Sequence, residues 1–178
     1  LVADGDCSGT SVATSSFKTN KQVGVVLSTA KGIALSGCEM SGNSAHGLQA
    51  LGACGGTTLT GSKLSGNVKS GVVLSAAQGI TINAGNTIES NAGNGLYADN
   101  LCTGTKVGGN TISKNGNAGV FLSAAKYISV INNTVADNAT FGLNASGLST
   151  GTTVMGNKFS GSPKNISVTA TGGTFQLV

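Results

Sequence analysis

Apolar and polar residues alternate in short stretches that recur every 23 or 24 residues along the chain. When these stretches are aligned from a leading glycine, the second position is Leu, Val or Ile, and in the first seven copies the fourth is Leu or Ala. The second position is occupied by Leu1, Val25, Leu48, Val72, Leu96, Val120, Leu143 and Ile166. Side chains two positions apart lie on one face of a β-strand. Each repeat therefore predicts a strand with one buried face.

Two further apolar columns predict two more short strands in every repeat. The first reads Val12, Leu35, Leu59, Ile82, Val107, Val130 and Val154, and the second reads Phe17, Met40, Leu64, Ile88, Ile112, Val135 and Phe159. Asparagines follow the second column at Asn20, Asn43, Asn67, Asn91, Asn115 and Asn138. Asparagine tolerates the left-handed backbone of a corner, and stacked Asn amides can hydrogen-bond to one another. The repeat thus predicts three strands and three corners.

A repeat of this length must stack on its neighbours to bury its apolar face. The sequence predicts an all-β chain that forms a right-handed parallel β-helix, a solenoid of about seven coils with three short strands per coil. Left-handed β-helices usually repeat through hexapeptides, and leucine-rich repeats need an L-x-x-L-x-L-x-x-N pattern. Neither pattern is present. We expect residues 1–178 to form a single β-helix domain that is a segment of a longer chain.

Alternate repeats match each other better than neighbouring repeats do. Leu27, Leu74 and Leu122 alternate with Ala3, Ala50, Ala98 and Ala145 in one column, and Ile33, Ile80 and Ile128 alternate with Thr10, Thr57, Thr105 and Thr152 in another. Both columns are bulky in the same repeats. We expect bulky and small layers to alternate inside the rod, so that each large side chain spreads over the small ones beside it.

Composition and charge exclude two classes of partner. The chain has ten lysines, no arginine and six acids, and the lysines are scattered. A protein that binds nucleic acid would cluster Lys and Arg beside aromatic residues that stack on bases, so we expect no nucleic-acid partner. No stretch of about 18 apolar residues is present, so we expect no membrane span.

The cysteines and titratable residues predict no reactive centre. Cys7, Cys54 and Cys102 share a column in every second repeat, about 9.6 Å apart at the usual strand spacing, which is beyond disulfide reach. We interpret them, and Cys38 at another corner, as small buried thiols. His46 lacks a nearby Cys or carboxylate, which indicates a surface residue. The acids form no convincing acid/base pair. We therefore expect no catalytic residue, metal or cofactor in this chain.

The outward face of the first strand is the best candidate surface. Its columns place Tyr97 beside Phe121, flanked by Asp99 and Ser123, with Lys126 and Tyr127 beyond the next bend. Exposed aromatic rings can stack on sugars, and lysine attracts an acidic sugar. The six residues therefore form a candidate substrate-binding strip. The alternative is that a loop, a further domain or a sister chain covers it.

The corner pattern N-x-I-x-x-N followed by G-[VL] resembles a known repeat. It occurs at Asn86, Ile88, Asn91 and Gly95-Leu96, and again at Asn110, Ile112, Asn115 and Gly119-Val120. This resembles the parallel β-helix repeat of the pectate-lyase-like superfamily, which includes NosD-like domains, alginate epimerases and phage tailspikes. The resemblance covers nearly the whole chain and implies the fold, while the repeat is shared by enzymes and non-catalytic surface proteins.

The chain departs from the enzymes of that superfamily in each of their motifs. Pectate lyases share a catalytic arginine and calcium-binding aspartates, and this chain has no arginine. Polygalacturonases carry an N-T-D motif, where the nearest string here is Asn132-Asn133-Thr134 followed by Val135. Alginate epimerases carry a D-P-H type of motif, whereas Pro163 follows Ser162. No catalytic residue of the superfamily transfers to this chain.

From these observations we expect an extracellular or surface-displayed scaffold that presents or binds carbohydrate, and acidic polysaccharide is the ligand to test first. One alternative is a polysaccharide-modifying enzyme, namely a lyase, a C5-epimerase or a tailspike depolymerase of glycans. Another is a structural adhesin or fibre segment. Both ends of such a rod expose strand edges, so we expect a homo-oligomer such as a trimer, or capping domains outside this segment. A column of hydroxyls interrupted by Lys106 gives ice binding little support.

Overall fold

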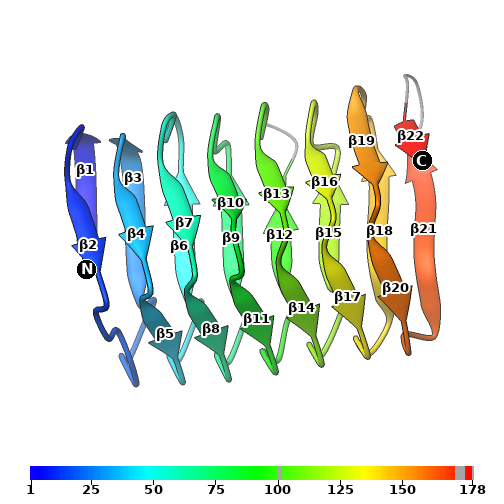
Figure 1. Ribbon diagram of the computed structural model, residues 1–178, viewed down its shortest axis with the longest axis horizontal. Helices are drawn as coiled ribbons and strands as arrows, with labels where there is room; N and C mark the ends of the chain where they lie inside the picture. Colours follow the sequence, from blue (N-terminus) through cyan, green and yellow to red (C-terminus); the bar gives the residue numbers. More distant parts are fainter. Residues whose placement is uncertain (100–101, 171–174, 178) are drawn as a thin grey trace.

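The computed structural model describes residues 1–99, 102–170 and 175–177, and in it the chain winds into a rod of parallel strands (Figure 1). Three parallel sheets, here named A, B and C, run along the rod and contain eight, eight and six strands. Successive coils add one strand to each sheet, so neighbouring strands are about one repeat apart in sequence. The predicted all-β solenoid with three strands per coil is confirmed.

The strands of each sheet are short, and most hold three or four residues. Sheet A contains β1 (Val2–Asp6), β3 (Val25–Lys31), β6 (Leu48–Leu51), β9 (Val72–Ser75), β12 (Leu96–Ala98), β15 (Val120–Ser123), β18 (Phe141–Gly147) and β21 (Lys164–Ala170). Sheet B contains β2 (Ser11–Ala13), β4 (Ala34–Ser36), β7 (Thr58–Thr60), β10 (Thr81–Asn83), β13 (Lys106–Gly108), β16 (Ser129–Ile131), β19 (Thr152–Met155) and β22 (Phe175–Leu177). Sheet C contains β5 (Glu39–Ser41), β8 (Lys63–Ser65), β11 (Thr87–Glu89), β14 (Thr111–Ser113), β17 (Thr134–Ala136) and β20 (Lys158–Ser160).

The interior is a single apolar column with alternating bulky and small layers. In sheet A, Leu27 pairs with Ala50 and Ala50 with Leu74, and none of the three is exposed. In the small layers Thr57, Thr105 and Thr152 are buried, whereas Thr10 in the first coil is exposed. The Thr57 hydroxyl donates to the Ala30 carbonyl oxygen at 2.9 Å. The predicted layering is therefore confirmed. The hydrogen bond offsets the cost of burying the Thr57 hydroxyl, whereas the buried Thr105 hydroxyl has no hydrogen-bond partner among the described residues.

Two ladders of buried side-chain amides run along the rod. At the corner between sheets C and A, the Asn67 amide donates to the Asn91 carbonyl oxygen at 2.8 Å, and the Asn91 amide donates to that of Asn115 at 3.0 Å. At the corner between sheets B and C, the Asn86 amide donates to the Asn110 side chain at 2.8 Å. Each amide thus supplies the partner that the amide before it needs.

The leading glycine of each repeat is required by the first ladder. A β-carbon at Gly95 would lie 2.6 Å from the Gly119 carbonyl oxygen, 2.6 Å from Ile112 and 2.8 Å from the Asn115 amide nitrogen. Real β-carbons do not approach other atoms so closely. Only glycine allows successive coils to approach at this corner, which explains why the repeat begins as it does.

The four cysteines are free thiols, and Cys38, Cys54 and Cys102 are buried. Burial raises the pKa of the Cys102 thiol to about 12 and also raises the pKa of Cys54. The interpretation as small buried thiols is confirmed for these three, whereas Cys7, in the first coil, is half-buried. Within the described ranges no helix is long and apolar enough to cross a membrane.

Candidate functional site

Tyr97 and Phe121 form an aromatic pair on the outer face of sheet A. They are register partners on β12 and β15, and their ring centroids are 5.5 Å apart with an interplanar angle of 72°. Both side chains are half-buried. This edge-to-face geometry stabilises the pair and leaves an apolar ledge open to solvent. The predicted neighbourhood of the two rings is thus present.

Asp99 lies directly after β12, and its carboxylate is hydrogen-bonded within the rod. It accepts from the Ser75 hydroxyl at 2.5 Å and from the Ala76 backbone N–H at 2.9 Å. Ala76 has a left-handed backbone with φ of 53°, so the carboxylate stabilises the corner that follows β9. Within the candidate substrate-binding strip, Asp99 therefore stabilises the corner of the preceding coil.

Ser123 and Lys126 carry the strip round the corner from sheet A towards sheet B. Ser123 ends β15 and pairs with Ser146 in the next coil. The Lys126 backbone N–H donates to the Cys102 carbonyl oxygen at 3.0 Å, and its side chain is half-buried. The strip therefore spans the outer face of sheet A and the corner that joins it to sheet B.

Tyr127 occupies a corner position that the other coils build with glycine. The equivalent residues are Gly9, Gly32, Gly56, Gly79, Gly104 and Gly151, all with positive φ. Tyr127 has φ of 54°, and the side chain is 63% exposed. A bulky residue in this conformation costs roughly 1–2 kcal/mol relative to glycine. The coil therefore presents a large aromatic ring at the surface from a residue whose backbone is strained.

The ring of Tyr127 lies over the glycine of the next coil. A β-carbon at Gly151 would overlap two carbon atoms of the ring. The Tyr127 backbone N–H also donates to the Thr150 carbonyl oxygen at 2.8 Å. The ring is thus placed across two coils, with one edge on the rod and most of its surface in solvent.

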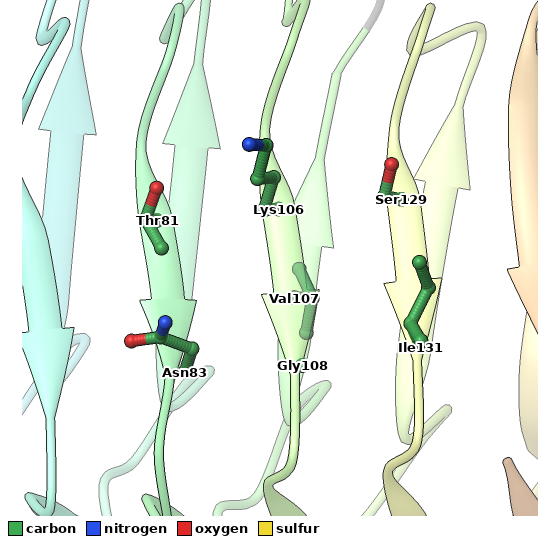
Figure 2. Close-up of a pocket in the computed structure, with 7 residues that line it drawn as sticks. All are labelled: Thr81, Asn83, Lys106, Val107, Gly108, Ser129 and Ile131. Atoms are coloured by element: carbon green, nitrogen blue, oxygen red, sulfur yellow. The ribbon is translucent and has the colours of Figure 1, made fainter. Parts of the chain in front are cut away.

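Sheet B carries a hollow that the sequence did not reveal. It has a volume of about 340 Å³ and is centred on β13, where Gly108 has no side chain (Figure 2). It is lined by Thr81, Asn83, Lys106, Val107, Gly108, Ser129 and Ile131. Val107 points inward and is buried, so the walls of the hollow are the outward side chains of β10, β13 and β16. The signal in the sequence is a lone glycine in an outward column.

Two ion pairs are present among the described residues. Glu39 pairs with Lys18 at 2.5 Å and Glu89 with Lys63 at 3.1 Å, both on sheet C. His46 is half-buried, and its Nδ1 accepts from the Ser70 N–H at 3.2 Å. Burial and the nearby Lys69 lower the pKa of His46. Across the described part of the chain no three His, Cys, Asp or Glu residues are grouped as metal ligands.

The sequence matches the family model of the right-handed β-helix region over residues 2–159, so the chain belongs to the right-handed β-helix family. This confirms the predicted hand of the coil. No protein with a curated description is matched by the sequence.

Solved structures of polysaccharide-active enzymes share the fold. The chain is similar to the A-module of a mannuronan C-5 epimerase from Azotobacter vinelandii, with a TM-score of 0.72, 15% identity, and coverage of 94% of this chain and 57% of the other. For a variant of the periplasmic alginate epimerase AlgG the TM-score is 0.78 at 15% identity, and the match covers 94% of this chain and 50% of the other. For pectate lyase Pel9A the TM-score is 0.67 at 12% identity, and the match covers 99% of this chain and 65% of the other. The chain therefore spans about half the length of the two epimerase structures and shares their fold.

Proposed function

We propose that this β-helix binds polysaccharide and that Tyr127 is its principal sugar contact. The observation that carries the proposal is the exposed ring of Tyr127 in a left-handed corner that six other coils build with glycine. Strain of this kind persists where another gain compensates for it, and such residues cluster at ligand-binding sites. Burial of the ring is too small to be that gain, because 63% of the residue is exposed.

The surroundings of Tyr127 suit a sugar ligand. An aromatic ring presents a flat apolar face to the C–H face of a pyranose. The Tyr97–Phe121 ledge and the Ser123 hydroxyl lie on the adjoining face of the rod and extend the surface for a chain of several sugars. Lys126 is next in sequence, and the formal net charge is +4, so acidic polysaccharide is the favoured class. The names of the similar structures, alginate epimerases and a pectate lyase, support the same class.

The binding role is preferred to catalysis because of the state of Asp99. It is the only acid in the strip, and its carboxylate already accepts hydrogen bonds from Ser75 and Ala76. A general base must reach the proton that it removes, so a carboxylate committed to a corner is poorly placed for that work. The proposal places this binding at an extracellular or cell-surface location, where such polymers occur.

Affinity electrophoresis tests the proposal. The protein is run through gels that contain alginate, polygalacturonate or dextran, and we expect retardation in the two acidic gels and free migration in dextran. Tyr127→Gly should abolish the retardation. Ser90→Gly is the matched control, because Ser90 is an exposed residue with φ of 54° at a corner beside sheet C. It should be retarded like the wild type.

Three results would overturn the proposal. Free migration of the wild type in every gel would leave a structural scaffold. Retardation of Tyr127→Gly equal to the wild type would remove Tyr127 from the contact surface. Unsaturated products, seen as ultraviolet absorbance after incubation with alginate or polygalacturonate, would replace the binder with a lyase.

A further inference from the structure

Strand β13 carries two departures from the outward columns of sheet B, and they lie side by side. Lys106 is the one charged residue in the column Ser11, Ala34, Thr58, Thr81, Lys106, Ser129 and Thr153. Gly108 is the one glycine in the column Ala13, Ser36, Thr60, Asn83, Gly108, Ile131 and Met155. Residues two apart on a strand share a face. A cation therefore lies next to a position with no side chain.

The neighbours of these two residues close the hollow on both sides. Thr81 and Ser129 are the register partners of Lys106, and Asn83 and Ile131 are those of Gly108. Figure 2 shows the open space at Gly108 between the side chains of Asn83 and Ile131, with the Lys106 side chain at the same face. The volume of about 340 Å³ falls at the lower end of the range for small-ligand pockets.

Lys106 brings an uncompensated charge to this hollow. Among the described residues, the ion pairs involve Lys18 and Lys63, both on the sheet C side, and no carboxylate pairs with Lys106. The other polar groups that line the hollow are the hydroxyls of Thr81 and Ser129 and the Asn83 amide, all uncharged. The site therefore favours an anion.

We infer that the hollow at Gly108 is a second ligand site, which takes a sugar acid, with the carboxylate on Lys106 and the ring against Ile131. The ammonium group of Lys106 donates to the carboxylate in a charge-assisted hydrogen bond. Thr81, Ser129 and Asn83 can exchange hydrogen bonds with the sugar hydroxyls, and the Ile131 side chain covers an apolar face of the ring. This site is on a different sheet from the Tyr97–Phe121 ledge and does not depend on the polysaccharide role of Tyr127.

Gly108 offers a variant that fills the hollow without harming the fold. It has an ordinary strand backbone, and a β-carbon there would meet only the Ile131 carbonyl oxygen, at 3.4 Å. Gly108→Thr introduces a β-branched residue. Strands favour such residues, and the preceding strands of sheet B contain threonine on the same face. We expect its thermal midpoint to equal or exceed that of the wild type.

The test is a titration of the ¹⁵N-labelled protein with sodium glucuronate, followed by amide chemical shifts. We expect saturable shifts at Lys106, Gly108 and Ser129, at least tenfold weaker binding in Lys106→Gln, and no saturable shift at these positions in Gly108→Thr. Lys158→Gln removes one exposed charge from sheet C and should bind like the wild type.

Two parallel titrations, with glucose and with acetate, test whether both the ring and the carboxylate of the sugar acid are needed for binding. Glucose lacks the carboxylate and acetate lacks the ring, so each should shift the same amides at least tenfold more weakly than glucuronate does. Equal response to acetate would mean a simple anion contact and would overturn the sugar assignment. Unchanged glucuronate binding in Gly108→Thr, or equal losses in Lys106→Gln and Lys158→Gln, would overturn the site itself. These readouts use a monosaccharide at sheet B, so they are separate from polysaccharide retardation through Tyr127.

Discussion

The ring of Tyr127 occupies the space that a β-carbon of Gly151 would need, so the residue types at two neighbouring coils are coupled. Gly151 has φ of 66°, and its lack of a side chain is what lets the aromatic ring lie across the coil boundary. The strained residue and the glycine beneath it form one unit at the corner between sheets A and B.

The first prediction concerns that coupling. Gly151→Ala should destabilise the protein by about 2 kcal/mol, because the left-handed conformation penalises a side chain and the added methyl group displaces the Tyr127 ring. In the Tyr127→Gly background the same substitution should cost at least about 0.5 kcal/mol less, since the overlap is gone. Urea unfolding of the four proteins measures the cycle. Strict additivity would mean that the ring does not rest on Gly151.

The second prediction separates stability from binding at Tyr127. Tyr127→Gly should be as stable as the wild type or more stable by up to about 1 kcal/mol, because relief of backbone strain offsets the lost ring contacts. Thermal unfolding by circular dichroism measures it, with Ser90→Gly as the reference for strain relief alone. A marked loss of stability in Tyr127→Gly would assign the ring a structural role in place of a binding one.

The third prediction concerns the alternating interior. Ala50→Leu and Ala98→Leu should each destabilise the rod by about 1–3 kcal/mol, because the small layer has no room for a second bulky side chain beside Leu74. The opposite change, Leu74→Ala, should cost about 2–5 kcal/mol through the cavity that it leaves. Unchanged urea midpoints for the two Ala→Leu variants would contradict the layered packing.

The fourth prediction concerns the amide ladder. Asn91→Ala should destabilise the rod by about 2 kcal/mol or more, because the buried Asn67 amide loses one of its two acceptors and the Leu64 carbonyl oxygen loses the Asn91 donor. Asn20→Ala, at the exposed first position of the ladder, removes a donor that lies partly in solvent and should cost less. Denaturant unfolding compares the two, and equal costs would mean that burial of the ladder adds nothing.

The fifth prediction concerns the buried thiols. At pH 8 the native protein should react with iodoacetamide at Cys7 and leave Cys102 unmodified, because burial holds the pKa of Cys102 at about 12 and keeps the thiol protonated. Mass spectrometry of native and denatured samples measures this, and rapid native labelling of Cys102 would contradict it.

The same thiol gives stability a pH dependence. In the unfolded chain a cysteine has a pKa of about 8.5. Its pKa is raised in the folded state, so its contribution to stability is complete below that pH and is lost as the pH rises towards 12. Cys102→Ala should reduce the fall in stability over this alkaline range.

The fold was predictable from the sequence because the residues that stack on one another occupy equivalent positions of successive repeats. The pairing of Leu27 with Ala50 and of Tyr97 with Phe121 follows from repeat spacing alone, and both pairs are present. The ladder at Asn91 was predictable for the same reason, since its neighbours in the column are also asparagines. Periodicity specifies which residues meet along the rod.

The details of the surface were not predictable in the same way. Asp99 was expected beside the aromatic pair as a sugar contact, and the hydrogen bonds of its carboxylate to the preceding coil were not expected, because they depend on the local geometry of the corner. The strain at Tyr127 depends on its φ, and its only signal in the sequence is that Tyr127 stands in a repeat column otherwise occupied by glycine. The hollow at Gly108 exists because a side chain is absent there. Its size and lining depend on the positions of the neighbouring side chains, which the structure supplies.

Tyrosine fluorescence tests the central claim most directly, because the chain has no tryptophan and only two tyrosines. In the Tyr97→Phe variant the emission comes from Tyr127 alone, and we expect a saturable change in its intensity on titration with alginate or polygalacturonate oligosaccharides and none with dextran oligosaccharides. An unchanged Tyr127 emission in this variant, at oligosaccharide concentrations that saturate the retardation of the protein in the gels, would contradict the account. The sugar would then bind elsewhere than at Tyr127.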